Sequence, residues 1–270
     1  MATLYFVVFN QAEVLDFSGP FDVFSMARIA TKTDPYDMKI ISVDGKPIRA
    51  IHGFMVMPEA AISDVTPGKD DIVFIPGGAT AILTAIAAGD KRLEHITPDS
   101  NALGPLEKDA LAKECGAIVT WLAEQCQEAG ILATICAGAF FGARAGIFTG
   151  QQATTHHGMV SLLDQWIGSA SPLPPCQQAQ IVAGARYVIN KAGAPLILSS
   201  AGVSAGLDLS MYLLEQIMCP TAVRLTETLM EYNGTRNFSA SNAPQPNIPE
   251  GLRFCAVDTL GQPICGCSTS

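Results

Sequence analysis

The sequence predicts an α/β fold in which helices cover both faces of a mostly parallel sheet. Short runs of β-branched or aromatic residues alternate with longer helical patterns, as in chains built from βαβ units. Two of the runs, 72–75 and 131–135, are apolar almost throughout. Strands at the centre of a parallel sheet have this composition because they are buried on both faces.

The predicted elements follow one another along the whole chain. Strands are expected at 4–9, 38–43, 72–75 and 131–135, and helices at about 20–30, 81–88 and 105–129. Residues 186–189 and 196–198 flank Asn190-Lys-Ala-Gly, a pattern that predicts a hairpin or two adjacent strands. Two further helices are expected at about 204–218 and 221–232, because Pro220 suits the first turn of the second one.

A single domain with additions is the organisation that the length predicts. The chain has 270 residues, near the upper size for one domain, and shows neither an internal repeat nor a composition shift that would divide it. We expect one domain over 1–243, with an insertion at about 89–104. Residues 244–270 are rich in Pro, Gly and Cys, and are expected to form a tail across the surface or at a partner interface.

The composition excludes several classes of function. The net charge of −9 and the absence of a Lys/Arg cluster argue against a nucleic-acid partner. The apolar run at 4–9 is too short to cross a bilayer, and no basic residue precedes it, so a cytoplasmic protein without a membrane anchor is expected. Most of the eight cysteines should then be thiols, and the Cys265-Gly-Cys267 pair lacks zinc-site spacing, so no metal is expected. No cofactor is expected either, since no Gly-x-Gly-x-x-Gly follows a strand.

Cys136 is the first candidate for chemistry. It ends the apolar run 131–135 and is followed by the small residues Ala137-Gly138-Ala139, as in the strand–nucleophile–helix elbow of hydrolases. A sulfur at a helix N-terminus is expected to ionise below the ordinary thiol pKa of about 8.5. The alternative is a buried cysteine with only a packing role.

Two other segments could complete such a site. Gly77 and Gly78 end the preceding strand, and their N–H groups could form an oxyanion hole with that of Ala137, although Pro-Gly-Gly is also common in tight turns. Asp16 has apolar neighbours, so burial would raise its pKa and make it a proton donor. It could instead cap a helix.

Five motifs in this order resemble the ThiJ/PfpI superfamily, whose domain is similar to class I glutamine amidotransferases, and most closely its branch of isonitrile hydratases and regulators. They are Leu15-Asp16-Phe-Ser-Gly-Pro-Phe-Asp22-Val, Ile75-Pro-Gly-Gly78, Ile135-Cys136-Ala-Gly-Ala139, Ala153-Thr-Thr-His156 and Ser200-Ala-Gly-Val-Ser-Ala-Gly-Leu-Asp208. The resemblance extends from Leu4 to about Tyr232. It implies a flavodoxin-like three-layer sandwich with a cysteine nucleophile elbow, usually in a homodimer.

The resemblance also assigns roles to residues. It implies that Cys136 is the nucleophile and that Asp16 is the acidic partner that hydrogen-bonds it. His156 stands where some glyoxalase-like relatives complete a Cys-His pair, whereas His157 is expected to have a packing or surface role. Ala137 departs from the hydratases, which typically carry a threonine directly after the nucleophile.

The resemblance implies an enzyme that acts on a small electrophilic substrate and hydrates an isonitrile to an N-substituted formamide. One alternative is glutathione-independent glyoxalase or deglycase chemistry on 2-oxoaldehydes, with His156 moving protons. The other is a stress sensor without turnover, in which Cys136 is oxidised to a sulfinic acid. A regulator is disfavoured, because no helix-turn-helix pattern follows the domain.

Overall fold

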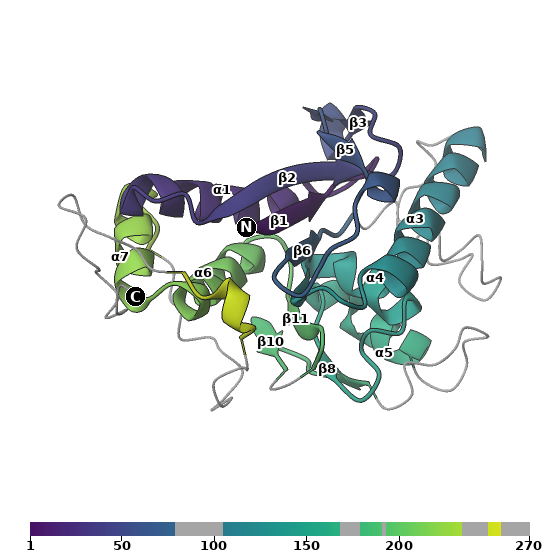
Figure 1. Ribbon diagram of the computed structural model, residues 1–270. Helices are drawn as coiled ribbons and strands as arrows, with labels where there is room; N and C mark the ends of the chain where they lie inside the picture. The colour runs from purple at the N-terminus through teal and green to yellow at the C-terminus, as the bar shows by residue number, and fades with distance from the viewer. Residues whose placement is uncertain (79–104, 168–178, 191–192, 234–247, 255–270) are drawn as a thin grey trace.

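The computed structural model describes residues 1–78, 105–167, 179–190, 193–233 and 248–254 (Figure 1). Its central sheet has the strand order β10-β11-β7-β6-β1-β2-β5, and all neighbours pair in parallel except β10 and β11. The strands of this sheet are β1 (Ala2–Val7), β2 (Tyr36–Ser42), β5 (Ala60–Ala61), β6 (Ile72–Ile75), β7 (Ile131–Thr134), β10 (Tyr187–Ile189) and β11 (Leu196–Ser200). The predicted fold class, a flavodoxin-like sandwich with a mostly parallel sheet, is confirmed.

Helices cover both faces of the sheet, as Figure 1 shows. Helix α1 packs against α6 and α7 on one face, while α3 and α5 each contact α4 on the other. Their bounds are α1 (Val14–Thr31), α3 (Pro105–Gln125), α4 (Ala139–Arg144), α5 (Val160–Ile167), α6 (Ala205–Ile217) and α7 (Pro220–Leu229). The predicted helix at 81–88 and the predicted insertion at 89–104 lie outside the described residues.

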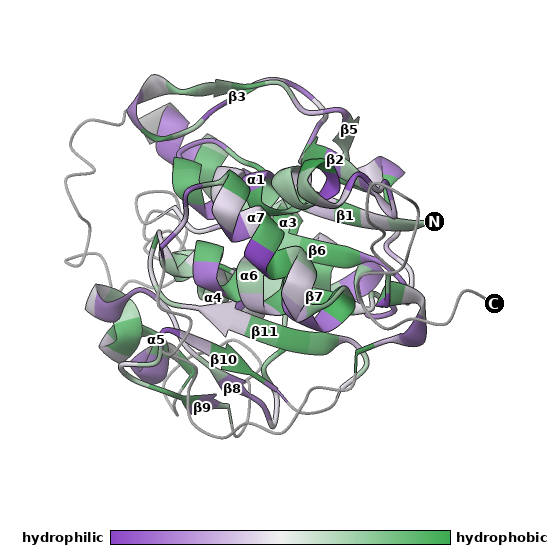
Figure 2. Cartoon of the chain, turned by 90° about the vertical axis from the view of Figure 1, so that its left-hand side faces the viewer, coloured by the Kyte–Doolittle hydropathy of each residue, from purple (hydrophilic) through white to green (hydrophobic). Residues whose placement is uncertain are grey.

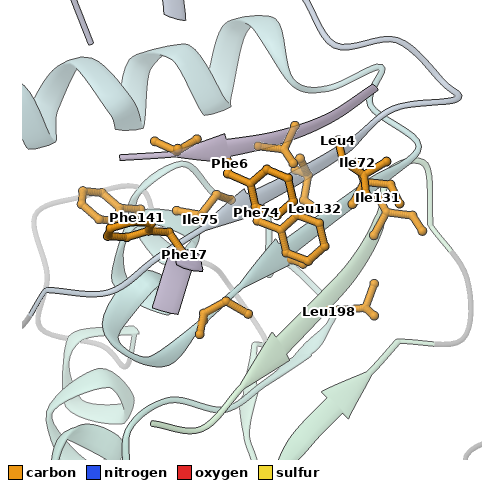
Figure 3. Packing of buried hydrophobic residues seen from close by; sticks show 14 of the residues in the cluster. Leu4, Phe6, Phe17, Ile72, Phe74, Ile75, Ile131, Leu132, Phe141 and Leu198 are labelled. Carbon is orange, nitrogen blue, oxygen red and sulfur yellow. The ribbon is translucent and has the colours of Figure 1, made fainter. Parts of the chain in front are cut away.

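The hydrophobic core lies along the middle strands. Every residue of β6 and β7 is buried, and the two strands pair from Ile72 opposite Ile131 onward. The rings of Phe6 and Phe74, from neighbouring strands, stack with their centroids 5.0 Å apart (Figure 3). Burying one such side chain contributes roughly 1.5–3 kcal/mol, so a slipped register would be costly.

Several short elements were not predicted. They are the antiparallel pair β3 (Ile48–Arg49) and β4 (Met55–Val56), the parallel pair β8 (Gln152–Ala153) and β9 (Gln180–Ile181), helix α5, and single 3₁₀ turns at Ile51–Gly53, Ile62–Asp64, Cys136–Gly138, His157–Met159 and Glu250–Leu252. A strand of two residues is too short for its periodicity to be recognised in a sequence.

Helix α1 begins earlier than predicted. The prediction placed its start at about Pro20, since proline favours the first helical turn. In the structure the helix begins at Val14 and Pro20 lies inside it, because apolar residues on both sides of the proline, Phe17 and Val23 among them, are buried together. Asp16 is therefore part of the first turn of α1.

Part of the C-terminal segment belongs to the core. Ile248 and Leu252 are buried, and the N–H of Phe254 donates to the carbonyl of Ile217 at 2.6 Å. Leu252 packs beside Gly130, which directly precedes β7, since a Cβ on Gly130 would lie 3.0 Å from its side chain. The tail was expected to lie across the surface or at a partner interface, but these residues of it pack into the core. The rest of 244–270 lies outside the described residues.

The described cysteines are not all thiols. Cys115, Cys126 and Cys136 are free, whereas Cys219 is disulfide-bonded. None of the helices in the described ranges is long and apolar enough to cross a membrane.

Candidate functional site around Cys136

Cys136 occupies a strained elbow at the carboxyl end of β7. Its φ of +55° lies in the left-handed region, which costs a residue with a side chain of order 1–3 kcal/mol. Two contacts hold it there. Its N–H donates to the carbonyl of Ala201 at 3.2 Å, and its own carbonyl accepts from the Thr155 hydroxyl at 2.9 Å. A 3₁₀ turn then leads into α4, so the predicted strand–cysteine–helix elbow is present.

Gly138 allows this elbow to pack against the neighbouring strand. A Cβ at Gly138 would lie 2.2 Å from the carbonyl oxygen of Ile75 and 2.9 Å from that of Pro76, and neither backbone atom can move aside. We therefore expect Gly138→Ala to destabilise the protein by about 3 kcal/mol.

Urea denaturation would measure this loss, with Gly116→Ala as the matched control. Gly116 lies inside α3, and a Cβ there would meet nothing within 4 Å. Because alanine is the better helix former, the control should gain up to about 1 kcal/mol. Equal effects of the two substitutions would contradict the packing argument.

Asp16 is fully buried beside the elbow. Its Oδ2 accepts the N–H of Gly77 at 2.9 Å, and its Oδ1 has no hydrogen-bond partner among the described residues. Burial raises the pKa of Asp16 to about 7, and the charge of Glu13 adds to this, while the Gly77 N–H and the Cys136 thiol lower it. The carboxyl therefore changes its ionisation near neutral pH, as the sequence predicted from its apolar neighbours.

The predicted direction of the Cys136 pKa is wrong. The sulfur was expected to ionise easily at a helix N-terminus, but burial raises its pKa to about 12, with a further contribution from the charge of Asp16. The helix that follows has only six residues and is separated from Cys136 by a 3₁₀ turn, so its dipole is a weak influence. A negative charge on either group disfavours a negative charge on the other. Above neutral pH the pair Cys136 and Asp16 therefore holds one proton between them.

Backbone N–H groups of Val203 and Ala137 act against this effect and lower the pKa of Cys136 by hydrogen bonding to its sulfur. Val203 belongs to the turn after β11 and has a φ of +47°, a strained conformation for a β-branched residue. The sequence did not single out Val203, although it lies within the 200–208 motif.

Of the two predicted oxyanion glycines, Gly77 lies against the elbow and Gly78 lies against the loop after β1. A Cβ on Gly77 would lie 2.6 Å from the N atom of Ala137 and 2.8 Å from Oδ2 of Asp16, so only glycine fits between them. Gly78 faces the loop after β1, where a Cβ would lie 2.5 Å from the carbonyl of Gln11. Because the Gly77 N–H already binds Asp16, an oxyanion role of Gly77, Gly78 and Ala137 stays a prediction.

His156 lies near the elbow but forms no hydrogen bond to Cys136 within the described structure. Its Nδ1 accepts the N–H of Gly158 at 3.1 Å, and its ring packs over Gly202 and beside the ring of His157. Burial, together with His157, lowers the pKa of His156. It is therefore neutral at pH 7, and the Gly158 bond leaves its proton on Nε2.

A pocket of about 610 Å³ adjoins the elbow. Among its walls are Thr155, Ala201 and Val203, each of which hydrogen-bonds Cys136, although the cysteine itself is not part of the lining. The volume is within the range of small-molecule sites. Its other described lining residues are His156, His157, Val160, Gly184, Ala185, Arg186, Gly202, Asp208, Tyr232 and Asn233. The described ranges contain no cluster of three side chains suited to a metal.

These features define a flavodoxin-like α/β protein built around one elbow cysteine and a buried carboxyl. The DJ-1/PfpI family model matches residues 2–91. An uncharacterised protein from the cpoL 5′ region of Streptomyces lividans is 32% identical over 150 residues, which cover 56% of this chain and 84% of that protein. The chain belongs to the DJ-1/PfpI family, the ThiJ/PfpI superfamily that its motifs resemble.

Two other relatives match nearly the whole chain. The isonitrile hydratase of Pseudomonas putida is 22% identical over 254 residues, which cover 93% of this chain and 89% of that enzyme. The crystal structure of a ThiJ/PfpI family protein from Pseudomonas syringae superposes with a TM-score of 0.60 at 19% identity, covering 90% of this chain and 81% of that one. The structural similarity to the Pseudomonas syringae protein shows that the two chains share a fold.

Proposed function

We propose that this protein hydrates an isonitrile to an N-substituted formamide, with Cys136 as nucleophile and Asp16 as proton carrier. The observation that carries the proposal is the buried pair in which a carboxyl with a pKa of about 7 lies against the thiol. The near full-length similarity to an isonitrile hydratase supports this choice of substrate class.

The first step joins the substrate to the enzyme. The Asp16 carboxylate takes the thiol proton while the sulfur attacks the terminal carbon of R–N≡C, so that one S–C bond forms. Asp16 then returns the proton to the same carbon, which gives the thioimidate R–N=CH–S–Cys136. The proton only moves between neighbouring groups, and the N–H groups of Val203 and Ala137 stabilise the sulfur while it carries charge.

The second step releases the product. Water adds to the thioimidate carbon as Asp16 moves its proton, and the addition product is R–NH–CH(OH)–S–Cys136. Breaking its C–S bond returns a proton to the sulfur and leaves R–NH–CHO. The sum is one isonitrile and one water consumed for each formamide, and this balance requires no redox change.

The direct test follows the loss of an alkyl isonitrile and the appearance of its formamide by mass spectrometry. Turnover by the wild-type protein is the expected result, despite Ala137 at the position where hydratases carry threonine. A protein that leaves the isonitrile unchanged at millimolar concentration would contradict the proposal.

His156 separates this proposal from glyoxalase chemistry. No hydrogen bond joins His156 to Cys136 in the part of the chain that the structure describes, so His156→Ala should reduce isonitrile turnover by less than about fivefold. On methylglyoxal, a glyoxalase in which His156 moves protons would lose about 10²- to 10⁴-fold. Measuring lactate from methylglyoxal and formamide from the isonitrile with the same variant decides between the two. His157→Ala, the neighbouring histidine, is the matched control.

The domain bounds 1–243, the homodimer and the cytoplasmic location stay predictions from the sequence and its resemblance. Sedimentation of the full chain would test the dimer.

A further inference from the structure

The pocket beside Cys136 has a charged network in its wall. The Nε–H of Arg186 donates to Oδ2 of Asp208, and the Tyr232 hydroxyl donates to Oδ1 of the same carboxylate. Arg186 also donates from Nη2 to the hydroxyl of Ser204 at 3.0 Å. Arg186, Asp208 and Tyr232 line the pocket, and they come from segments before β10, in α6 and after α7.

The two charges of this network differ in their access to the pocket. The Asp208 side chain is only 5% exposed and each of its oxygens already accepts a hydrogen bond, whereas 30% of the Arg186 side chain is exposed. A guanidinium has five N–H donors, and the contacts above use two of them. The remaining three have no partner among the described residues, so Arg186 retains donors for a ligand.

The other polar groups of the pocket favour an anion. His156 is neutral with its proton on Nε2, so this side chain is a second donor. Among the described lining residues Asp208 is the one carboxylate, and Arg186 and Tyr232 occupy both of its oxygens. Planar guanidinium groups bind carboxylates with two parallel hydrogen bonds.

We propose that Arg186 binds a carboxylate at the end of the substrate remote from the reacting carbon. Arg186 and Val203 line the same pocket, and the N–H of Val203 hydrogen-bonds the Cys136 sulfur, so the proposed subsite and the nucleophile adjoin one cavity. This subsite rests on the proposed function. It makes small isonitriles that carry a carboxylate the preferred substrate class. Isocyanoacetate is the simplest probe, and its hydration product is N-formylglycine.

Turnover of isocyanoacetate is compared with that of isocyanoacetamide, which has the same shape without the charge. The wild-type protein should prefer the carboxylate by at least about tenfold in kcat/KM, the effect of one hydrogen-bonded charge pair. Arg186→Gln combined with Asp208→Asn removes both charges together, so no buried carboxylate is left unpaired. The preference should then fall below about twofold.

The ratio of the two substrates is taken within each variant, so a general loss of activity cancels. Arg224→Gln removes an exposed charge on α7 that does not line the pocket, and should leave the tenfold preference intact. An unchanged preference in the double variant, or none in the wild type, would overturn the carboxylate subsite while leaving the hydratase proposal in place.

A binding measurement separates the two proposals if neither isonitrile reacts. Calorimetry with Cys136→Ser compares the affinity for N-formylglycine with that for N-formylglycinamide. Binding of these two compounds can be measured without turnover. Tighter binding of the acid, by about tenfold, that disappears in the Arg186→Gln, Asp208→Asn background supports the subsite even when the hydratase proposal fails. Equal binding of acid and amide contradicts it.

Discussion

Cys136→Ser is expected to abolish isonitrile turnover, with a loss of at least about 10³-fold in kcat. A serine hydroxyl is a weaker acid than a thiol and a much weaker nucleophile, so the Asp16 carboxylate is a poorer base for it than for Cys136. The backbone contacts of the elbow, to Ala201 and Thr155, do not involve the sulfur, so the fold should persist.

Formamide production measured by mass spectrometry checks this expectation, beside a thermal melt that verifies the fold. Cys126→Ala is the matched control, since Cys126 is another buried cysteine with a free thiol. It should retain activity, although it loses some core packing. Full turnover by Cys136→Ser would mean that the chemistry takes place elsewhere.

The second large effect is expected from Asp16→Asn, with a loss of about 10²- to 10⁴-fold in kcat/KM. The amide has nearly the same shape and its oxygen can still accept the Gly77 N–H, but it cannot carry a proton between sulfur and substrate. Glu13→Gln removes the nearby carboxylate that raises the pKa of Asp16, and should leave kcat within about threefold. A comparable loss in both variants would argue against a specific role of Asp16.

The pH dependence of activity gives an independent readout of Asp16. The pair holds two protons below the pKa of about 7 and one above it, so wild-type kcat/KM should rise as the pH passes through about 7. Residual activity of Asp16→Asn should lack this rise. An identical pH profile for the two proteins would contradict the assignment.

Stability should respond to the same group in the opposite sense. The folded pKa of Asp16 is raised, so the folded chain retains a proton that the unfolded chain releases. The stabilising contribution is full below pH of about 4 and is lost as the pH rises to about 7. Urea denaturation at several pH values should show a weaker decline across this window for Asp16→Asn than for the wild type.

The central strands and the elbow could be predicted from the sequence because their information is local. Strand β6 was predicted with its observed bounds, and β7 to within one residue, since uninterrupted apolar runs are characteristic of buried parallel strands. In Figure 2 the first residues of β11 are hydrophobic and its carboxyl end is pale, because the strand ends in two serines.

Long-range contacts account for what the sequence did not reveal. The pKa of Cys136 depends on its burial and on Asp16, which is distant in the chain and is placed by the unexpectedly early start of α1. The pairing of Arg186 with Asp208 likewise brings together two segments whose motifs give no sign of contact. Only the fold determines which of these charges meet.

Leu252 also bears on the order in which the protein is made. It packs beside Gly130 at the amino end of β7, the strand whose other end carries Cys136. The ribosome adds Leu252 long after β7, so a nascent chain that already contains every residue of the elbow still has that end of the strand uncovered. A chaperone that binds apolar segments would therefore have a target on this chain until Leu252 has been made.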